Sequence, residues 1–280
     1  MGGPCSLIKS SYLHSRTNMK KNITQNPDAE KRSEEFSLKP ITLEGEFPFK
    51  CYPGISCYNR CCKDTDILLT PYDILRLRQA LGITCADFLQ TRVNYLKLPG
   101  TEIPLVKLKN QEDEQASCIF LKSEGCSFYH DRPTVCRSYP IGFGLADKRF
   151  LEDHQKNFMI VESLCHGHRE QQKWTLEQWK TDQQLENFDA FNQPWIELLV
   201  RLKTLAGKKL EEQQRSWFLM GCYDLDTFRQ FVTQSSFPSK FAVPETRILE
   251  VESKDEALLM LALDWLKFMF FQEGPLKPKS

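Results

Sequence analysis

Apolar residues at helical spacing predict two helices early in the chain, each opened by a threonine. Thr70 precedes Pro71 and Asp73, and this combination suits a helix start because proline fits the first turn and an acidic group favours the positive end of the helix dipole. The apolar positions continue on one face until Gly82, which is predicted to end the helix. Thr84 is the predicted N-cap of the second helix.

Short runs with strand character surround these helices. The region from 46 to 170 contains no long amphipathic segment beyond the two helices, so we expect short strands linked by irregular loops. The predicted strands are residues 67–69, 103–108 and 158–161, together with a hairpin formed by 141–145 and 149–153.

The pattern becomes helical from Thr175 onward. Thr175 is predicted to form a capping box with Gln178, and Pro194 is predicted to open a helix that ends at Gly207. Residues 171–273 hold all five tryptophans, whose spacing along amphipathic helices favours core packing over a ligand platform. These tryptophans are Trp174, Trp179, Trp195, Trp217 and Trp265.

Two further helices are predicted near the C-terminus. Asp224 is the expected cap of the first, and Ser253 with Glu256 forms an S-x-x-E capping box for the second, which runs to Phe270. The second helix is apolar, but charged residues interrupt it and it is too short to span a bilayer. We therefore expect it to pack in the core.

These elements predict an α+β protein with four parts. Residues 1–45 are polar and lack periodicity, which is typical of a disordered arm, and order is expected to start near residue 47. Residues 46–170 are expected to form a small, irregular, metal-organised region with short strands. Residues 171–273 form a mainly helical region packed on it, and 274–280 form a tail.

Charge and composition argue against nucleic-acid binding, a membrane span and secretion. The chain has 280 residues with 37 basic and 37 acidic side chains, so its net charge of zero gives no reason to expect nucleic-acid binding. No apolar run is long enough for a membrane span. The N-terminal segment lacks the apolar stretch of a secretory signal, which predicts a cytoplasmic protein whose thiols stay reduced.

Cysteine is the unusual component of the chain. Nine of the eleven cysteines lie between Cys51 and Cys165. Cys85 among them starts a predicted helix, where it is either a small buried residue or a thiol of lowered pKa. The other eight are candidate ligands, since thiolates bind zinc, copper(I) and iron–sulfur clusters, and they could fill two four-coordinate sites or one site plus redox-active thiols. The candidates are Cys51, Cys57, Cys61, Cys62, Cys118, Cys126, Cys136 and Cys165.

The spacing of these cysteines favours iron over zinc. Structural zinc sites commonly use two C-x2–4-C knuckles, whereas ligands from separate segments at irregular spacing are usual for iron–sulfur clusters. In extended backbone, adjacent Cys61 and Cys62 would point in different directions and serve different metal atoms or different roles. Four basic residues lie beside the candidates and either offset thiolate charge or face solvent: Arg60, Lys63, Arg132 and Arg137.

Several segments carry a specific combination of motifs. They are residues 49–51, 57–62, 69–77, 118–121, 125–140 with the run DRPTVCRSYP, and Cys165. This combination, over about residues 47–170, resembles the YkgJ family of cysteine-cluster proteins, which is described as zinc- or iron-chelating. The resemblance implies metal chelation in a cytoplasmic bacterial setting. The common family opening is C-x2-C-x2-CC and this chain has C-x5-C-x3-CC, so the role of Cys51 stays open.

Three functions follow as hypotheses. The first is an iron–sulfur or iron-binding protein with a redox role, which would make it an oxidoreductase. The second is a zinc-stabilised binding module without catalysis. The third is an enzyme that modifies a protein partner, because flagellin lysine N-methylases have a similar cysteine opening. No catalytic residue can be assigned from the sequence, and the protein partner or substrate is not readable.

Overall fold

A computed structural model describes most of the chain and divides it into two compact units, residues 1–37 and 38–280. The description below concerns the second unit, into which strand β1 (Phe36–Pro40) leads. This strand begins earlier than residue 47, where the sequence indicated the start of order. The described residues are 36–42, 45–143, 157–204 and 210–279.

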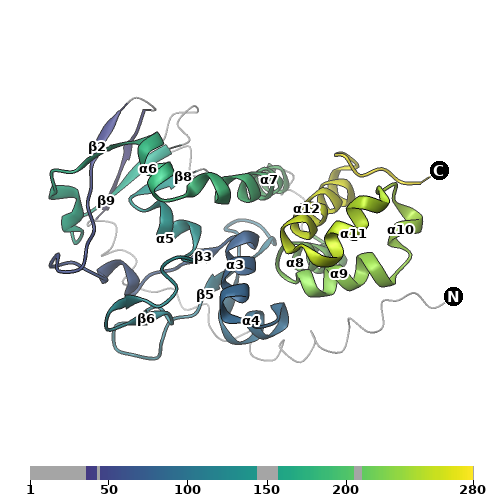
Figure 1. Cartoon of the computed structure of the whole chain (residues 1–280), viewed down its shortest axis with the longest axis horizontal. Helices are drawn as coiled ribbons and strands as arrows, with labels where there is room; N and C mark the ends of the chain where they lie inside the picture. The colour runs from purple at the N-terminus through teal and green to yellow at the C-terminus, as the bar shows by residue number, and fades with distance from the viewer. Residues whose placement is uncertain (1–35, 43–44, 144–156, 205–209, 280) are drawn as a thin grey trace. The chain divides into compact units, whose positions relative to one another are not determined.

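The fold is α+β, as predicted, with short strands in the first half and helices after them (Figure 1). The strands form four small sheets in the orders β1-β9-β8, β10-β2, β3-β5-β4 and β6-β7. The remaining strands are β2 (Glu46–Pro48), β3 (Leu68–Leu69), β4 (Val93–Lys97), β5 (Pro104–Leu108), β6 (Leu121–Lys122), β7 (Gly125–Cys126), β8 (Ile141–Phe143), β9 (Asn157–Glu162) and β10 (Lys173–Thr175).

The predicted strands at 67–69, 103–108 and 158–161 correspond to β3, β5 and β9. The predicted hairpin differs, because the described partner of β8 is β9, with Ile141 opposite Met159. Its second half, 149–153, lies outside the described residues. Strand β4, which pairs antiparallel with β5, was not predicted.

Both early helices begin where the sequence indicated, and the first also ends at the predicted residue. In α3 (Pro71–Leu81), the Thr70 hydroxyl accepts a bond from the Asp73 N–H at 3.0 Å, and the Asp73 carboxylate accepts from the Thr70 N–H at 2.9 Å. Gly82 ends α3 in the left-handed region at φ 66°. Helix α4 (Cys85–Thr91) follows with Thr84 as its N-cap.

The helical half begins with a confirmed capping box, formed by Thr175 and Gln178 at the start of α6. Asp224 likewise caps α9, where its side chain accepts a bond from the Thr227 N–H. The helices of this half are α6 (Leu176–Asp182), α7 (Leu185–Thr204), α8 (Glu212–Tyr223), α9 (Leu225–Gln234), α10 (Phe237–Lys240), α11 (Glu245–Ser253) and α12 (Asp255–Phe271).

Two predicted helix starts are wrong. Pro194 lies inside α7 instead of opening it, because α7 buries apolar side chains on both sides of the proline, and this packing outweighs the lost backbone hydrogen bond. Ser253 is the last residue of α11, and α12 starts after Lys254 with no side-chain cap. The predicted end at Gly207 lies outside the described residues.

One main apolar core joins the two halves of this unit. Helix α3 packs against α7, α8 and α12 (Figure 1), and the same core holds β3 and β5 side chains such as Leu69 and Val106. Trp179, Trp195 and Trp265 are buried, as the helical spacing predicted. Among the described residues, no helix has both the length and the apolar character needed to cross a membrane.

A second, smaller core lies beside the first cysteine and fixes the segment before it. Phe49 packs edge-on to Trp179, with ring centroids 5.4 Å apart. The Trp174 indole N–H donates to the Phe49 carbonyl at 2.8 Å. The buried members of this core are Phe47, Phe49, Ile141, Leu176, Trp179 and Leu185.

Candidate metal centre

Backbone contacts bring together cysteine segments that are far apart in the sequence. The Lys50 N–H donates to the Gly167 carbonyl at 3.1 Å, which sets Cys51 near Cys165. The Cys118 N–H donates to the Cys62 carbonyl at 2.7 Å. The loop before β6 therefore lies directly against the segment that carries the adjacent cysteines.

Three cysteines, Cys51, Cys57 and Cys165, form what we call the outer thiol group. Burial and the nearby thiols of Cys61, Cys165 and Cys57 raise the pKa of Cys51 from its ordinary 9.0 to about 11. The pKa of Cys165 is also raised, first by burial and then by Cys57 and Cys61. The His166 N–H donates to the Cys57 sulfur at 3.2 Å. The Lys50 and His166 hydrogen bonds therefore bring the segments that carry these three cysteines together.

Three others, Cys118, Cys126 and Cys136, form the inner thiol group. Cys118 is a buried member of the main core, and Cys126 and Cys136 pack against that core. Burial raises the pKa of Cys136 well above its ordinary value, and the thiols of Cys118, Cys61 and Cys126 raise it further. Desolvation is also the main cause of the raised pKa of Cys118 and of Cys126.

Cys61 and Cys62 lie between the two groups. They occupy a 3₁₀ turn (Arg60–Cys62), and the neighbouring Cys62 thiol and burial raise the pKa of Cys61. The expectation that the two thiols point apart assumed extended backbone, whereas both cysteines lie in this turn. Cys61 also raises the pKa of thiols in both groups.

The donor chemistry of these residues fits a metal ion. Thiols that raise one another's pKa resist ionisation when metal-free, and a bound cation reverses this by favouring the thiolate. Within the described ranges, however, no three His, Cys, Asp or Glu side chains are arranged to hold a metal ion. The fit therefore rests on the type and proximity of the donors, and not on a preformed coordination geometry.

One buried carboxylate positions the helix that carries Cys136. Asp73 in α3 uses Oδ1 to accept bonds from the Thr134 N–H at 2.8 Å and the Thr134 hydroxyl at 2.7 Å. Thr134 is the first residue of α5 (Thr134–Ser138). The Asn192 side-chain amide also donates to the Thr134 hydroxyl oxygen, at 2.9 Å, which links α7 to the same point.

The basic residues beside the cysteines have different roles. Arg132 lowers the pKa of Cys126 through its charge, as expected for a residue that offsets thiolate charge. Arg137 instead donates to the backbone carbonyls of Gln183 and His130, and burial lowers its pKa to about 10. Arg60 is exposed and Lys63 is half-buried.

Two other cysteines are separate from this centre. Cys85 is buried at the start of α4, and burial raises its pKa to about 12, so the alternative of a low-pKa thiol is wrong. Cys222 is buried in α8, where desolvation raises its pKa well above the ordinary value. Cys5 lies outside the described residues.

Three polar residues beside the outer thiol group were not predicted. The Tyr139 hydroxyl donates to Glu162 Oε2 at 3.0 Å and lies 3.4 Å from His168 Nε2. Burial raises the pKa of Tyr139 and lowers that of His168. The sequence signal for these residues was their position, since Tyr139 lies within the DRPTVCRSYP run and His168 follows Cys165 closely.

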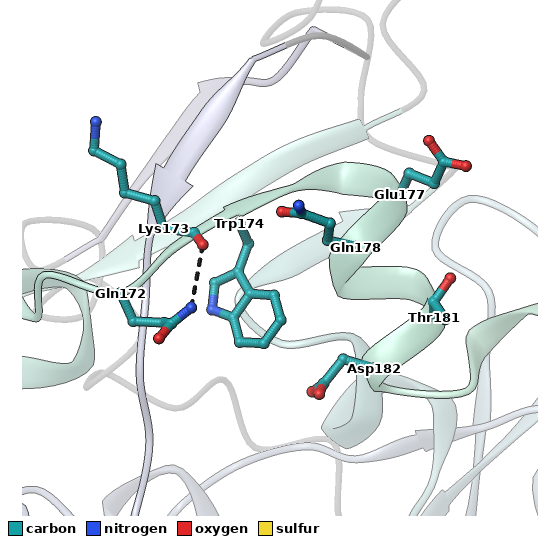
Figure 2. A pocket seen from close by; sticks show the side chains of 7 residues that line it. All are labelled: Gln172, Lys173, Trp174, Glu177, Gln178, Thr181 and Asp182. Atoms are coloured by element: carbon teal, nitrogen blue, oxygen red, sulfur yellow. Dashed lines mark hydrogen bonds between the residues drawn. The ribbon is translucent and has the colours of Figure 1, made fainter.

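An open hollow of about 610 Å³ lies along α6. Figure 2 shows the Trp174 ring beside this helix, with Gln172 bonded to the Lys173 carbonyl at the hollow's edge. No cysteine lines the hollow, so it is not part of the thiol centre. Its lining residues are Gln172, Lys173, Trp174, Glu177, Gln178, Thr181 and Asp182.

The cysteine-rich region matches a known protein-family model. Residues 50–166 match the family model described as "CxxCxxCC: Putative zinc- or iron-chelating domain". These residues are similar to a CxxCxxCC domain. The predicted resemblance to the YkgJ family is consistent with this match, and all eight candidate cysteines lie inside it. The chain thus carries a metal-binding cysteine cluster. No curated protein and no solved structure matches the chain significantly.

Proposed function

We propose that this protein binds iron, as an iron–sulfur cluster or as thiolate-ligated iron, and that it has a redox role. The observation that supports the proposal is that backbone hydrogen bonds bring distant cysteine segments together: Lys50 bonds Gly167, Cys118 bonds Cys62, and the His166 N–H bonds the Cys57 sulfur. If each thiol group takes its fourth ligand from the Cys61–Cys62 pair, the eight thiols complete two four-coordinate centres. Such centres need reduced thiols, which supports a cytoplasmic location.

The structural elements that carry the eight candidate ligands support iron over zinc. The eight sulfurs come from loops, one 3₁₀ turn, a two-residue strand and a short helix, and not from paired zinc knuckles. The His166 N–H bond to the Cys57 sulfur supports redox tuning as well, because hydrogen bonds to sulfur help to set the potential of iron–sulfur centres. Bound iron would supply one-electron chemistry, and this chain's thiols and N–H groups would hold it and adjust its potential.

Zinc is the second candidate, and the buried inner thiol group favours it. A closed four-thiolate environment inside a core is the usual setting of structural zinc. In that case the domain is a metal-stabilised binding module without redox chemistry.

Anaerobic purification of the full-length protein tests the proposal. We expect iron by elemental analysis and a visible absorption band that weakens on addition of dithionite, because thiolate-bound iron is coloured and changes oxidation state. Acid-labile sulfide would distinguish an iron–sulfur cluster from iron bound by thiolates alone. A colourless protein with stoichiometric zinc and no iron would replace the proposal with the zinc module.

A further inference from the structure

The open hollow along α6 has an aromatic ring in its wall. The Trp174 indole N–H donates to the Phe49 carbonyl at 2.8 Å, and the ring packs edge-on with Trp179, with centroids 5.3 Å apart. These two contacts fix the ring beside the helix, where Figure 2 shows it. Because the N–H is already bonded, the ring offers an occupant its apolar surface and the negative potential of an aromatic face, but no hydrogen-bond donor.

The hollow also has two acidic residues in its lining. Glu177 lies in the first turn of α6 and Asp182 is the last residue of this helix, and both are exposed. Asp182 accepts a hydrogen bond from the neutral Gln183 side-chain amide at 2.7 Å. Within the described ranges, neither carboxylate has an ion-pair partner. Two uncompensated negative charges therefore line the hollow.

The nearby lysines are already paired with other carboxylates. Lys173 is the single cation among the described residues that line the hollow, and its Nζ lies 3.3 Å from Glu46 Oε2. Lys180, which also belongs to α6, forms an ion pair with Asp189 at 2.9 Å. These lysines therefore leave the two carboxylates of the hollow available to an external positive charge.

We propose that this hollow docks a basic segment of a partner protein, with a lysine or arginine side chain of that segment lying against the Trp174 ring. Charge complementarity argues for this occupant, because the two carboxylates and the aromatic face all attract a cation. The volume of about 610 Å³ lies within the range of ligand-binding sites, and the open side of the hollow allows a peptide chain to continue past it. The inference adds a partner class to the proposed function and does not depend on bound metal.

Binding of a basic peptide to the full-length protein tests the proposal. The probe is a fluorescein-labelled peptide in which lysine alternates with glycine, and the comparison is a peptide with glutamate in place of lysine. Fluorescence anisotropy should show at least roughly tenfold tighter binding of the lysine peptide, and its affinity should fall as added salt screens the charges.

Two variants test whether the peptide binds at the hollow. Glu177→Gln combined with Asp182→Asn removes both charges at exposed positions and should weaken peptide binding by roughly three- to tenfold. Trp174→Leu keeps an apolar side chain but removes the aromatic face, and should weaken binding by about three- to tenfold. Glu245→Gln combined with Glu252→Gln is the matched control, because it removes the same charge from exposed positions of α11, and it should leave binding unchanged.

Three results would contradict docking of a basic segment at this hollow. Equal binding of the two peptides would exclude charge complementarity, and unchanged binding in the Glu177 and Asp182 variant would place the peptide elsewhere. Displacement of the peptide by an equal concentration of spermidine would show that the site takes a small cation instead. If circular dichroism shows that Trp174→Leu is unfolded, the charge variant alone decides the site. Metal content should be the same in all folded variants, so failure of this inference leaves the proposed iron binding intact.

Discussion

At the scale of single residues, Gly167 shows how closely the outer thiol group depends on backbone packing. A Cβ there would lie 2.9 Å from the Lys50 carbonyl oxygen and 2.9 Å from the Phe49 ring. Gly167→Ala should therefore separate Cys51 from Cys165, lower metal content and destabilise the fold by about 1–3 kcal/mol. Elemental analysis and urea unfolding would measure both effects.

Gly221→Ala is the matched control for crowding. Its Cβ would lie 2.9 Å from Leu266 Cδ1, inside the helical core and away from the cysteines. We expect lower stability with unchanged metal content. Equal metal loss in the two variants would mean that Gly167 acts only through general stability.

The assigned ligands should differ from the other cysteines when replaced by serine. Cys57→Ser or Cys136→Ser should lower both metal content and melting temperature, because metal binding and folding are coupled. Cys85→Ser and Cys222→Ser should leave metal content unchanged, since both thiols are buried apart from the centre. Loss of metal in Cys222→Ser but not in Cys136→Ser would contradict the ligand assignment.

The pKa of Cys85 predicts a pH dependence of its reactivity. Burial raises this pKa from 9.0 to about 12, so at neutral pH the thiolate fraction falls about a thousandfold relative to an ordinary thiol. Iodoacetamide labelling of Cys85 in the native protein should be slow and rise about tenfold per pH unit up to that pKa. Mass spectrometry would measure the rate of Cys85 labelling. Urea-unfolded protein, in which Cys85 is accessible and should label rapidly, is the control. Rapid labelling of the folded protein at neutral pH would show the prediction to be wrong.

At the scale of elements, Asp73 joins α3 to α5. An amide has one accepting oxygen, so Asp73→Asn must leave either the Thr70 N–H or the Thr134 donors without an acceptor. The expected cost is about 1–3 kcal/mol of unfolding free energy, with weaker metal retention because α5 carries Cys136. Urea unfolding and metal analysis measure these. The control Asp87→Asn changes an exposed carboxylate in α4, which accepts a hydrogen bond from the Thr84 hydroxyl, and this variant should keep its metal. If Asp73→Asn keeps wild-type stability and metal content, the proposed role of Asp73 in joining α3 to α5 is wrong.

At the scale of the whole molecule, the main core makes the cysteine region dependent on the helices. Leu69 and Val106 share this core with Leu199 and Leu266. Truncation to residues 46–170 exposes that surface, so the fragment should be insoluble or fail to retain metal. Solubility and metal analysis of the fragment test this. A soluble, fully metallated fragment would make the helical region a separate module and favour a role in binding a protein partner.

The sequence alone determined the features that depend on neighbouring residues. Thr70, Thr84, Thr175 and Asp224 cap helices where predicted, because capping is a local interaction between a side chain and the next turn. It also indicated the metal-binding chemistry, since eight thiols and the motif around DRPTVCRSYP are visible without a fold.

Only the tertiary structure decided how the thiols are divided. The closeness of Cys51 to Cys165 and the contact of Tyr139 with Glu162 depend on hydrogen bonds between distant segments, which no local spacing encodes. Pro194 remains inside α7 for the same reason, because burial of apolar side chains on both sides of it outweighs its own preference. Long-range packing thus set which sulfurs face solvent and which lie in the core.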